Sequence, residues 1–305
     1  MTTLLAASQT AALLPYPALA REIAALLADA LVRVPARLVQ ALPGGASLFV
    51  MPAFDARLAI AKLITFTPAN AGSGRPAIQG DVLVFDVASG ARRLQLDGPT
   101  VTARRTAAVS LLAAQRLAPG NAGPLLVVGA GAQGRAHLEA FAQGLGIREV
   151  RIASRSAASA SALAAHARTL GLQASVADDP ERQLADCPLA VTCTPAAGVV
   201  LRGRLRDDAF VAAVGAFTPA MVELAPQLCR DVAARGTIVV DTPDAQHEAG
   251  DLLQAGLDVA RLPDLRAVVL GPARPSPGPV LFKSCGWAGW DLAAARCAVD
   301  QLEQS

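Results

Sequence analysis

The sequence has 305 residues, a length typical of about two domains, and its 27 basic and 25 acidic side chains leave a formal net charge of +2. This balance excludes a strongly basic nucleic-acid-binding protein, and no stretch approaches the ~18 uninterrupted apolar residues of a membrane span. Because no basic residue precedes Arg21, the charged start of a signal peptide is missing. We therefore expect a soluble, cytoplasmic protein without a membrane or nucleic-acid partner.

The first third of the chain predicts helices around an antiparallel sheet. Residues 8–31 have apolar side chains at helical spacing, and Pro15 and Pro17 should confine the main helix to the residues after them. Short β-prone runs separated by Pro- and Gly-rich segments follow at 48–51, 58–66 and 82–87. A second helix is predicted at 100–117, and residues 119–124 are typical of a linker.

Strands and helices alternate from residue 125 onward. Apolar strands are predicted at 125–128, 150–153, 189–193, 210–214 and 237–240, with helices between them at 133–145, 159–170, 181–186 and 223–234. This alternation predicts a doubly wound parallel sheet, and thus an α/β fold. A Pro- and Gly-rich loop at 272–279 leads to a last helix at 289–302, which we expect to return to the first domain.

The cysteines and histidines predict neither a disulfide framework nor a metal site. The five cysteines include no C-x-x-C pair, and the three histidines lack metal-ligand spacing. The lysines are more informative, because Lys62 and Lys283 are the only two among the basic residues. Lysine is a compact, flexible ammonium and arginine a planar fork, so both positions are candidate sites where arginine would not fit.

A dinucleotide-binding motif follows the first strand of the alternating segment. Gly129, Gly131 and Gly134, with Ala132 and Gln133 between the last two, complete a G-x-G-x-x-G. The motif opens a predicted helix, the context in which glycines let the backbone approach a pyrophosphate at the helix N-terminus. An ordinary tight turn needs only one such glycine, so the pattern predicts a dinucleotide site.

The end of the second strand of this segment indicates which dinucleotide binds. NAD-binding proteins carry an acidic residue there, which holds the ribose 2′-hydroxyl. This chain instead has Ser154, Arg155 and Ser156. An arginine and two hydroxyls bind a 2′-phosphate that a carboxylate would repel, so we expect NADP(H) rather than NAD(H).

Three cations of the first domain are candidates for binding an anionic substrate. Arg37 precedes a β-prone pair, Lys62 lies in the run Ile-Ala-Lys-Leu-Ile, and Arg105 opens a predicted helix. A lysine flanked by aliphatic residues is costly to bury unless it meets an anion. Each arginine alone could form a surface ion pair, but several cations facing one cleft would hold a carboxylate.

Together, several motifs resemble the ornithine cyclodeaminase/mu-crystallin family over nearly the whole chain. They are Arg37-Leu38-Val39, Met51-Pro52-Ala53, Lys62-Leu63, Gln79-Gly80-Asp81-Val82, Arg105-Thr106-Ala107-Ala108, the glycine loop, Gly250-Asp251 and Phe282-Lys283-Ser284. The resemblance implies a substrate-binding and dimerisation domain of α+β type at 1–118 plus 285–305. It also implies an NADP-binding Rossmann domain at 119–284, and a homodimer.

The resemblance also implies the roles of individual residues. Arg37, Lys62 and Arg105 would hold the substrate carboxylate. The cofactor would be contacted by Arg105, Thr106, the glycine loop (Gly129, Gly131, Ala132, Gln133 and Gly134), Ser154, Arg155, Ser156, Thr194, Lys283 and Ser284.

One position departs from the cyclodeaminase pattern. Where those enzymes carry a catalytic aspartate after a sheet strand, this chain has Phe217, which can neither accept a proton nor orient a water. It could pack against an apolar ring of the substrate. Residues 97–100 and 284–290 are most similar to ketimine-reducing members, which implies NADPH-dependent reduction of cyclic imino acids, with L-proline or L-pipecolate as product.

The predicted catalytic residues are Lys62 and Glu248. Either Lys62 or a bound water would protonate the ring nitrogen, and Glu248 would stabilise the iminium charge, although Glu248 could also be an exposed acid at a helix end. Three other functions stay open on the sequence alone. They are ornithine cyclodeaminase, alanine dehydrogenase and an NADPH-dependent ligand-binding protein without catalytic activity.

Overall fold

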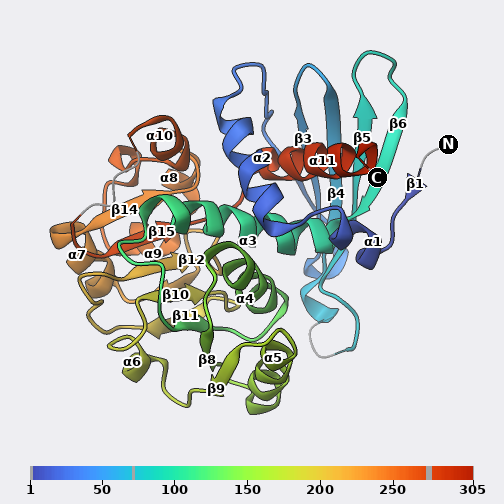
Figure 1. The fold of residues 1–305 in the computed structure, drawn as a ribbon. Coiled ribbons are helices and arrows are strands. Elements are labelled where there is room, and N and C mark those ends of the chain that lie inside the picture. Colours follow the sequence, from blue (N-terminus) through green and yellow to red (C-terminus); the bar gives the residue numbers. More distant parts are fainter. Residues whose placement is uncertain (1–2, 71–72, 273–276, 305) are drawn as a thin grey trace. The chain divides into compact units, whose positions relative to one another are not determined.

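The computed structural model describes residues 3–70, 73–272 and 277–304 (Figure 1). The chain divides into two compact units: unit 1 comprises Met1–Arg105 and Trp287–Ser305, and unit 2 comprises Thr106–Gly286. The first division falls inside helix α3 (Gly98–Leu117), whereas the sequence predicted domain boundaries at 118/119 and 284/285. Part of the predicted loop at 272–279 lies outside the described residues.

Unit 1 is built on a six-stranded sheet of order β1-β6-β5-β4-β3-β2. Strand β1 runs parallel to β6, and the other neighbours are antiparallel. The strands are β1 (Thr3–Leu4), β2 (Leu38–Ala41), β3 (Ser47–Phe54), β4 (Leu58–Phe66), β5 (Ile78–Asp86) and β6 (Arg92–Asp97). The predicted antiparallel sheet is confirmed, and β1, β2 and β6 are strands that the prediction lacked.

The two faces of this sheet differ in their surroundings. Because side chains alternate along a strand, Met51, Lys62 and Val82, which pair across β3, β4 and β5, share one face. All three are buried. On the opposite face, large apolar side chains stay partly exposed: Leu38 by 57%, Phe54 by 42% and Leu63 by 38%.

Helices cover the buried face of the unit 1 sheet. They are α1 (Ala7–Ala12), α2 (Tyr16–Ala28), the start of α3, and α11 (Ala288–Glu303). Helix α11 crosses strands β3 to β5 and lies beside α2 (Figure 1). The main N-terminal helix begins before Pro17, not after it, because proline is tolerated in the first helical turn.

Unit 2 contains a seven-stranded parallel sheet of order β14-β15-β12-β10-β7-β8-β9. The strands are β7 (Leu125–Val128), β8 (Glu149–Ala153), β9 (Gln173–Val176), β10 (Leu189–Thr192), β12 (Phe210–Ala213), β14 (Thr237–Val240) and β15 (Val280–Lys283). Every residue of β7, β10, β12 and β15 is buried, as expected for a sheet covered on both faces. The predicted doubly wound parallel sheet is confirmed.

The remaining elements of unit 2 connect these strands. They are α4 (Ala132–Leu145), α5 (Ala157–Thr169), α6 (Pro180–Gln183), α7 (Pro226–Arg235), α8 (Ala245–Glu248), α9 (Gly250–Gln254), α10 (Leu265–Leu270) and a small parallel pair, β11 (Ala197–Leu201) with β13 (Val222–Leu224). The helix predicted at 223–234 is wrong at its start. Glu223 lies on β13, and the helix begins at Pro226, which fits the first helical position.

The glycine motif follows β7, where the order of the strands in the sheet reverses. Strand β7 is first in the chain among the seven and lies between β8 and β10. Ligands of doubly wound sheets bind at such a switch point, beyond the carboxyl ends of the strands. Among the described residues, no helix is long and apolar enough to cross a membrane.

Candidate active site

A buried ion pair lies at the centre of the unit 1 sheet. Lys62 is 1% exposed, and its Nζ donates to Thr102 Oγ1 at 2.7 Å and to Asp291 Oδ1 at 3.0 Å. Strand β4 supplies the lysine, α3 the threonine and α11 the aspartate. Thr102 in turn donates to the carbonyl oxygen of Gly98, so its hydroxyl oxygen is directed toward the ammonium.

Arg105 adds a second cation to this cluster. Its Nε lies 3.5 Å from Asp291 Oδ1, and its side chain is 8% exposed. Two cations and one carboxylate leave the Lys62–Arg105–Asp291 cluster with a net charge of +1. Within the described part of the chain, Arg105 Nε and Asp291 Oδ2 have no hydrogen-bond partner. A buried donor without an acceptor, beside an excess positive charge, suits a carboxylate oxygen.

The environment of Lys62 also changes its acidity. Burial lowers the pKa of its ammonium, Asp291 opposes this effect, and the neighbouring Arg105 adds to it. The net direction is below the usual value of 10.5. Lys62 therefore gives up its proton more readily than an exposed lysine does.

The third predicted carboxylate ligand lies apart from this pair. Arg37 is exposed and directly precedes β2, whose first residue, Leu38, pairs with Val50. Continuing that register places Arg37 beside Met51, the β3 partner of Lys62. Two strand spacings separate Arg37 from Lys62, which is ~10 Å. The structure thus brings Lys62 and Arg105 together and leaves Arg37 at the sheet edge.

Sequence reasoning missed Asp291, the residue that joins the two cations. The signal was present, because Asp291 interrupts the almost entirely apolar run Ala288–Ala295. The argument that singled out Lys62, a charge embedded among apolar residues, applies equally to this carboxylate.

In unit 2 the glycine motif forms a tight turn between β7 and α4. Gly129 has φ +115°, and a Cβ there would lie 2.6 Å from the carbonyl oxygen of Cys193. A Cβ at Gly134 would lie 1.9 Å from Gly129 O, so helix and strand approach too closely for any side chain. Gly131 faces open space and caps α4 without a side-chain hydrogen bond. These residues fit a dinucleotide, whose pyrophosphate needs close backbone approach and a helix N-terminus.

Four other predicted cofactor residues follow strands, at the same edge of the sheet. Ser154, Arg155 and Ser156 directly follow β8; Arg155 is exposed, and Ser156 accepts from Ser159 N to cap α5. Thr194 lies in the loop after β10. Thr106 is buried in α3. Their contacts with a cofactor stay predictions.

Two residues predicted to contact the cofactor have partners inside unit 2. The Lys283 side chain is fully buried, and its Nζ lies 2.8 Å from Asp251 Oδ2. Ser284 Oγ donates to Asp241 Oδ2 at 2.8 Å. Lys283 is thus held inside unit 2 by Asp251, and the cofactor contacts of Lys283 and Ser284 stay predictions.

The two predicted substrate contacts of unit 2 lie on loops and short helices. Phe217 follows β12 and is 43% exposed. Glu248 is the last residue of α8 and is half-buried. Their roles stay predictions. Among the described residues, no group of three or more His, Cys, Asp or Glu side chains could hold a metal ion.

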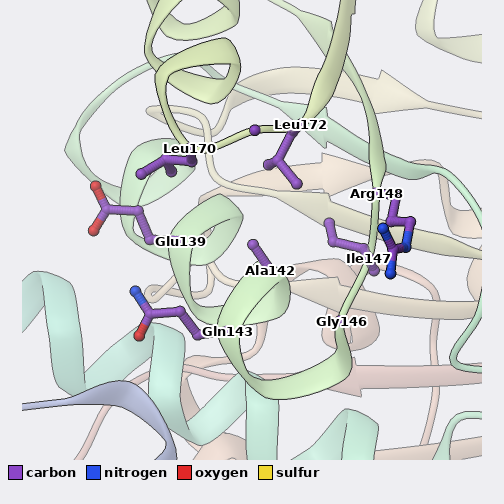
Figure 2. A pocket seen from close by; sticks show the side chains of 9 residues that line it. Glu139, Ala142, Gln143, Gly146, Ile147, Arg148, Leu170 and Leu172 are labelled. Atoms are coloured by element: carbon purple, nitrogen blue, oxygen red, sulfur yellow. The ribbon is translucent and has the colours of Figure 1, made fainter.

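A hollow of about 310 Å³ in unit 2 lies away from the glycine loop. Its lining includes Ala142, Gln143 and Ile147 near the end of α4, and Leu170 and Leu172 beyond α5 (Figure 2). The glycine loop adjoins the opposite end of α4, about 20 Å away for a helix of this length. The hollow is therefore separate from the dinucleotide motif.

Comparisons with known proteins agree with this architecture. The model of the ornithine cyclodeaminase/mu-crystallin family matches residues 24–305. The chain is 40% identical over 301 residues to Delta(1)-pyrroline-2-carboxylate reductase 1 of Burkholderia multivorans, covering 97% of this chain and 94% of the relative. It is also 40% identical to a Delta(1)-pyrroline-2-carboxylate/Delta(1)-piperideine-2-carboxylate reductase of Azospirillum brasilense, with the same coverage.

A solved structure shares the fold at lower identity. Delta(1)-pyrroline-2-carboxylate reductase of Thermococcus litoralis, in complex with NADH and L-proline, superposes with a TM-score of 0.86 at 21% identity. The match covers 100% of this chain and 98% of that one. With the family model spanning most of the sequence, this chain belongs to the ornithine cyclodeaminase/mu-crystallin family.

Proposed function

We propose that this protein reduces the C=N bond of cyclic ketimine carboxylates with NADPH. The substrates are the five-membered Δ1-pyrroline-2-carboxylate and the six-membered Δ1-piperideine-2-carboxylate, and the products are L-proline and L-pipecolate. The names of the two relatives at 40% identity, one of which includes both ring sizes, support this substrate class.

The observation that carries the proposal is the buried net charge of the Lys62–Arg105–Asp291 cluster. A single excess positive charge matches a substrate with one carboxylate. Charge-assisted hydrogen bonds from Lys62 Nζ and the Arg105 guanidinium would hold that carboxylate and so fix the position of the attached imine carbon. Orientation of this kind can lower a reaction barrier by several kcal/mol. The exposed Arg37 would then supply an outer contact.

The reaction needs one hydride at the imine carbon and one proton at the ring nitrogen. NAD(P)H supplies the hydride when bound. Lys62 is the proposed proton donor, because its ammonium is already hydrogen-bonded and its pKa is lowered by burial. Asp291 then holds Lys62 in place through the 3.0 Å contact while the proton leaves.

The dinucleotide is proposed to lie on unit 2. Gly129, Gly131 and Gly134 would receive the pyrophosphate at the N-terminus of α4. The exposed Arg155, with Ser154 and Ser156, would bind a 2′-phosphate. This assignment favours NADPH over NADH.

The open face of the unit 1 sheet supports the homodimer that the family resemblance implies. Leu38, Phe54 and Leu63 expose large apolar side chains on that face. Several large apolar side chains exposed on one face of a sheet are typical of an interaction site. We propose that a second copy of the chain covers it, and sedimentation equilibrium of the wild-type protein would report the dimer mass.

An assay with both ring sizes tests the proposed activity. The protein is incubated with NADPH and each imine carboxylate, and the loss of NADPH absorbance is followed alongside the formation of L-proline or L-pipecolate. We expect turnover of at least one ring size, with a lower KM for NADPH than for NADH. No turnover of either, or ammonia release from L-ornithine with catalytic NAD, would contradict the proposal. Phe217 in place of a catalytic aspartate argues against ammonia release.

A further inference from the structure

Glu223 lies fully buried beneath two loops at the carboxyl edge of the unit 2 sheet. Its Oε1 accepts from the backbone N–H and the hydroxyl of Thr194, at 2.7 and 2.9 Å. Its Oε2 accepts from Gly215 N at 2.6 Å and from Thr192 Oγ1 at 3.0 Å. Burial raises the pKa of the Glu223 carboxyl, and these donors together with the charge of Lys283 oppose that rise. Four donors to one carboxyl group stabilise its ionised form.

A second buried pair is attached directly to Glu223. Asp251 Oδ1 accepts from the backbone N–H of Glu223 at 2.6 Å and from that of Leu224 at 2.9 Å. Its other oxygen pairs with Lys283 Nζ at 2.8 Å. Burial lowers the pKa of Lys283, but Asp251, Cys285 and Glu223 outweigh it, and the net direction is upward. The ammonium therefore keeps its charge.

Two carboxylates and one ammonium give the Glu223–Asp251–Lys283 cluster a net charge of −1. The cluster is inaccessible to water, because all three side chains are fully buried. A further buried carboxylate, Asp241, follows β14 and accepts from Ser284 Oγ and Cys285 N. A charge in such surroundings acts over a longer distance than one in solvent.

The cluster contacts the carboxyl ends of three neighbouring strands and holds two of the loops that follow them. Thr194 and Gly215 belong to the loops after β10 and β12, and Lys283 ends β15. A Cβ at Gly215 would lie 2.4 Å from Glu223 Oε1, so this loop packs directly on the carboxylate. A Cβ at Gly250 would lie 2.1 Å from Met221 O, so the start of α9, which carries Asp251, packs closely against the backbone just before β13.

We propose that Glu223 positions the two loops that receive the nicotinamide end of the dinucleotide, and that the negative cluster favours the oxidised cofactor over the reduced one. The proposal rests on the proposed cofactor site. Loops at the carboxyl edge of a doubly wound sheet are where the second half of a dinucleotide lies when its pyrophosphate binds at the glycine turn. Glu223 is thus a positioning residue: it contacts Thr194 directly, and Thr194 would contact the cofactor.

The physical basis is the difference in charge between the two forms of the ring. Nicotinamide is cationic when oxidised and neutral when reduced, so a buried anion stabilises the oxidised form selectively. A unit charge ~10 Å away, at an effective dielectric constant near 20, changes a dissociation constant by roughly tenfold. Stabilising the cationic ring also assists hydride donation, because positive charge develops on the ring as the hydride leaves.

Binding measurements on Glu223→Gln test the proposal without relying on turnover. Calorimetric titration gives the Kd values of wild type and variant for NADP+ and NADPH, and again for NAD+ and NADH. We expect the ratio Kd(reduced)/Kd(oxidised) to fall roughly tenfold in Glu223→Gln. In Glu223→Asp, which keeps the charge on a shorter arm, both Kd values should rise while the ratio stays near that of wild type.

Glu181→Gln is the matched control. Glu181 also accepts from two backbone N–H groups, but these belong to Arg202 and Gly203 after β11, and neither is a predicted cofactor residue. Its substitution should leave the ratio unchanged. Lys283→Met is an independent second variant that raises the net negative charge, so the ratio should move in the opposite direction.

Each outcome has a definite meaning. An unchanged ratio in whichever of Glu223→Gln and Lys283→Met folds, as judged by circular dichroism, would overturn the proposal. An equal shift in Glu181→Gln would do the same. If wild type binds none of the four dinucleotides, the proposed function itself fails, and that result is distinct from an altered ratio.

Discussion

The two units contain similar buried clusters with opposite net charge. In unit 1, Lys62 pairs with Asp291 and a second cation, Arg105, leaves a net charge of +1. In unit 2, Lys283 pairs with Asp251 and a second anion, Glu223, leaves a net charge of −1. These are the only two lysines of the chain, and each is at most 1% exposed.

The difference shows how one arrangement can serve two kinds of ligand. A buried lysine–aspartate pair is neutral overall, so the third charged residue determines which charge is left uncompensated. A remaining positive charge suits a substrate carboxylate, and a remaining negative charge suits a cationic ring. Leaving a charge uncompensated inside a protein is costly, which makes both clusters better candidates for function than for stability.

The largest expected effect is on folding stability. Lys283→Met leaves two carboxylates, Asp251 and Glu223, without a cation and should lower the free energy of unfolding by about 3–5 kcal/mol. Lys62→Met should cost less, because Arg105 still lies 3.5 Å from Asp291. Urea unfolding followed by circular dichroism gives both values. Equal losses of unfolding free energy, or a larger loss for Lys62→Met, would mean that Arg105 does not compensate the charge of Asp291.

The next effect is on catalysis. Lys62→Ala and Arg105→Ala each remove a charged contact worth ~1.5–3 kcal/mol, so kcat/KM for the imine carboxylate should fall about tenfold or more. Steady-state kinetics with saturating NADPH measures it. Arg57→Ala is the control, because Arg57 forms an exposed ion pair with Asp300 in the same unit. Unchanged kinetics in both test variants would remove the proposed carboxylate site.

The pH dependence of substrate binding should separate the two lysines. The pKa of Lys62 is lowered and that of Lys283 is raised, in each case from 10.5. Neutral Lys62 no longer attracts a carboxylate, so KM for the imine should rise as the pH rises through the lowered pKa of Lys62. The Kd of NADPH should show no such change from Lys283.

The control for this pH profile is Lys62→Arg, because arginine stays charged at every pH at which the enzyme would be assayed. Its KM should not show the added rise at high pH, and subtracting its profile removes the titration of the substrate itself. The same profile in Lys62→Arg and wild type would show that Lys62 is not the titrating group.

The smallest effect is expected at the surface. Arg155 is exposed, so solvent weakens its attraction for a 2′-phosphate. Arg155→Ala should raise the KM for NADPH by up to about tenfold and leave that for NADH nearly unchanged. Kinetics with both cofactors, at low and high salt, tests this. A parallel rise for NADH would place Arg155 elsewhere in the site.

Much of the fold could be predicted from local patterns. The alternating strands and helices after residue 125 and the glycine motif are contiguous in sequence, so periodicity and spacing reveal them. Lys62 was also recognisable, because a lone charge within an aliphatic strand needs an anion. The strand β6 was missed although Leu94 and Leu96 alternate with polar residues and are buried.

The cluster partners could not be assigned from sequence because they are distant along the chain. Lys62 and Asp291 are 229 positions apart, and only the packing of α11 on the sheet joins them. Glu223 was predicted at the start of a helix. It instead lies on the short strand β13, whose residues are held by the long-range contacts of Asp251 to Glu223 N and Leu224 N.

The most direct test of the central claim compares two substrates in two proteins. Kinetics are measured for wild type and Lys62→Ala with Δ1-pyrroline-2-carboxylate and with 1-pyrroline, the same cyclic imine without the carboxylate. For each protein, the kcat/KM of the carboxylated imine is divided by that of 1-pyrroline. If Lys62 binds the carboxylate, this ratio should be at least about tenfold larger in wild type than in Lys62→Ala. An identical ratio in both proteins would contradict the assignment of the Lys62–Arg105–Asp291 cluster as the carboxylate site.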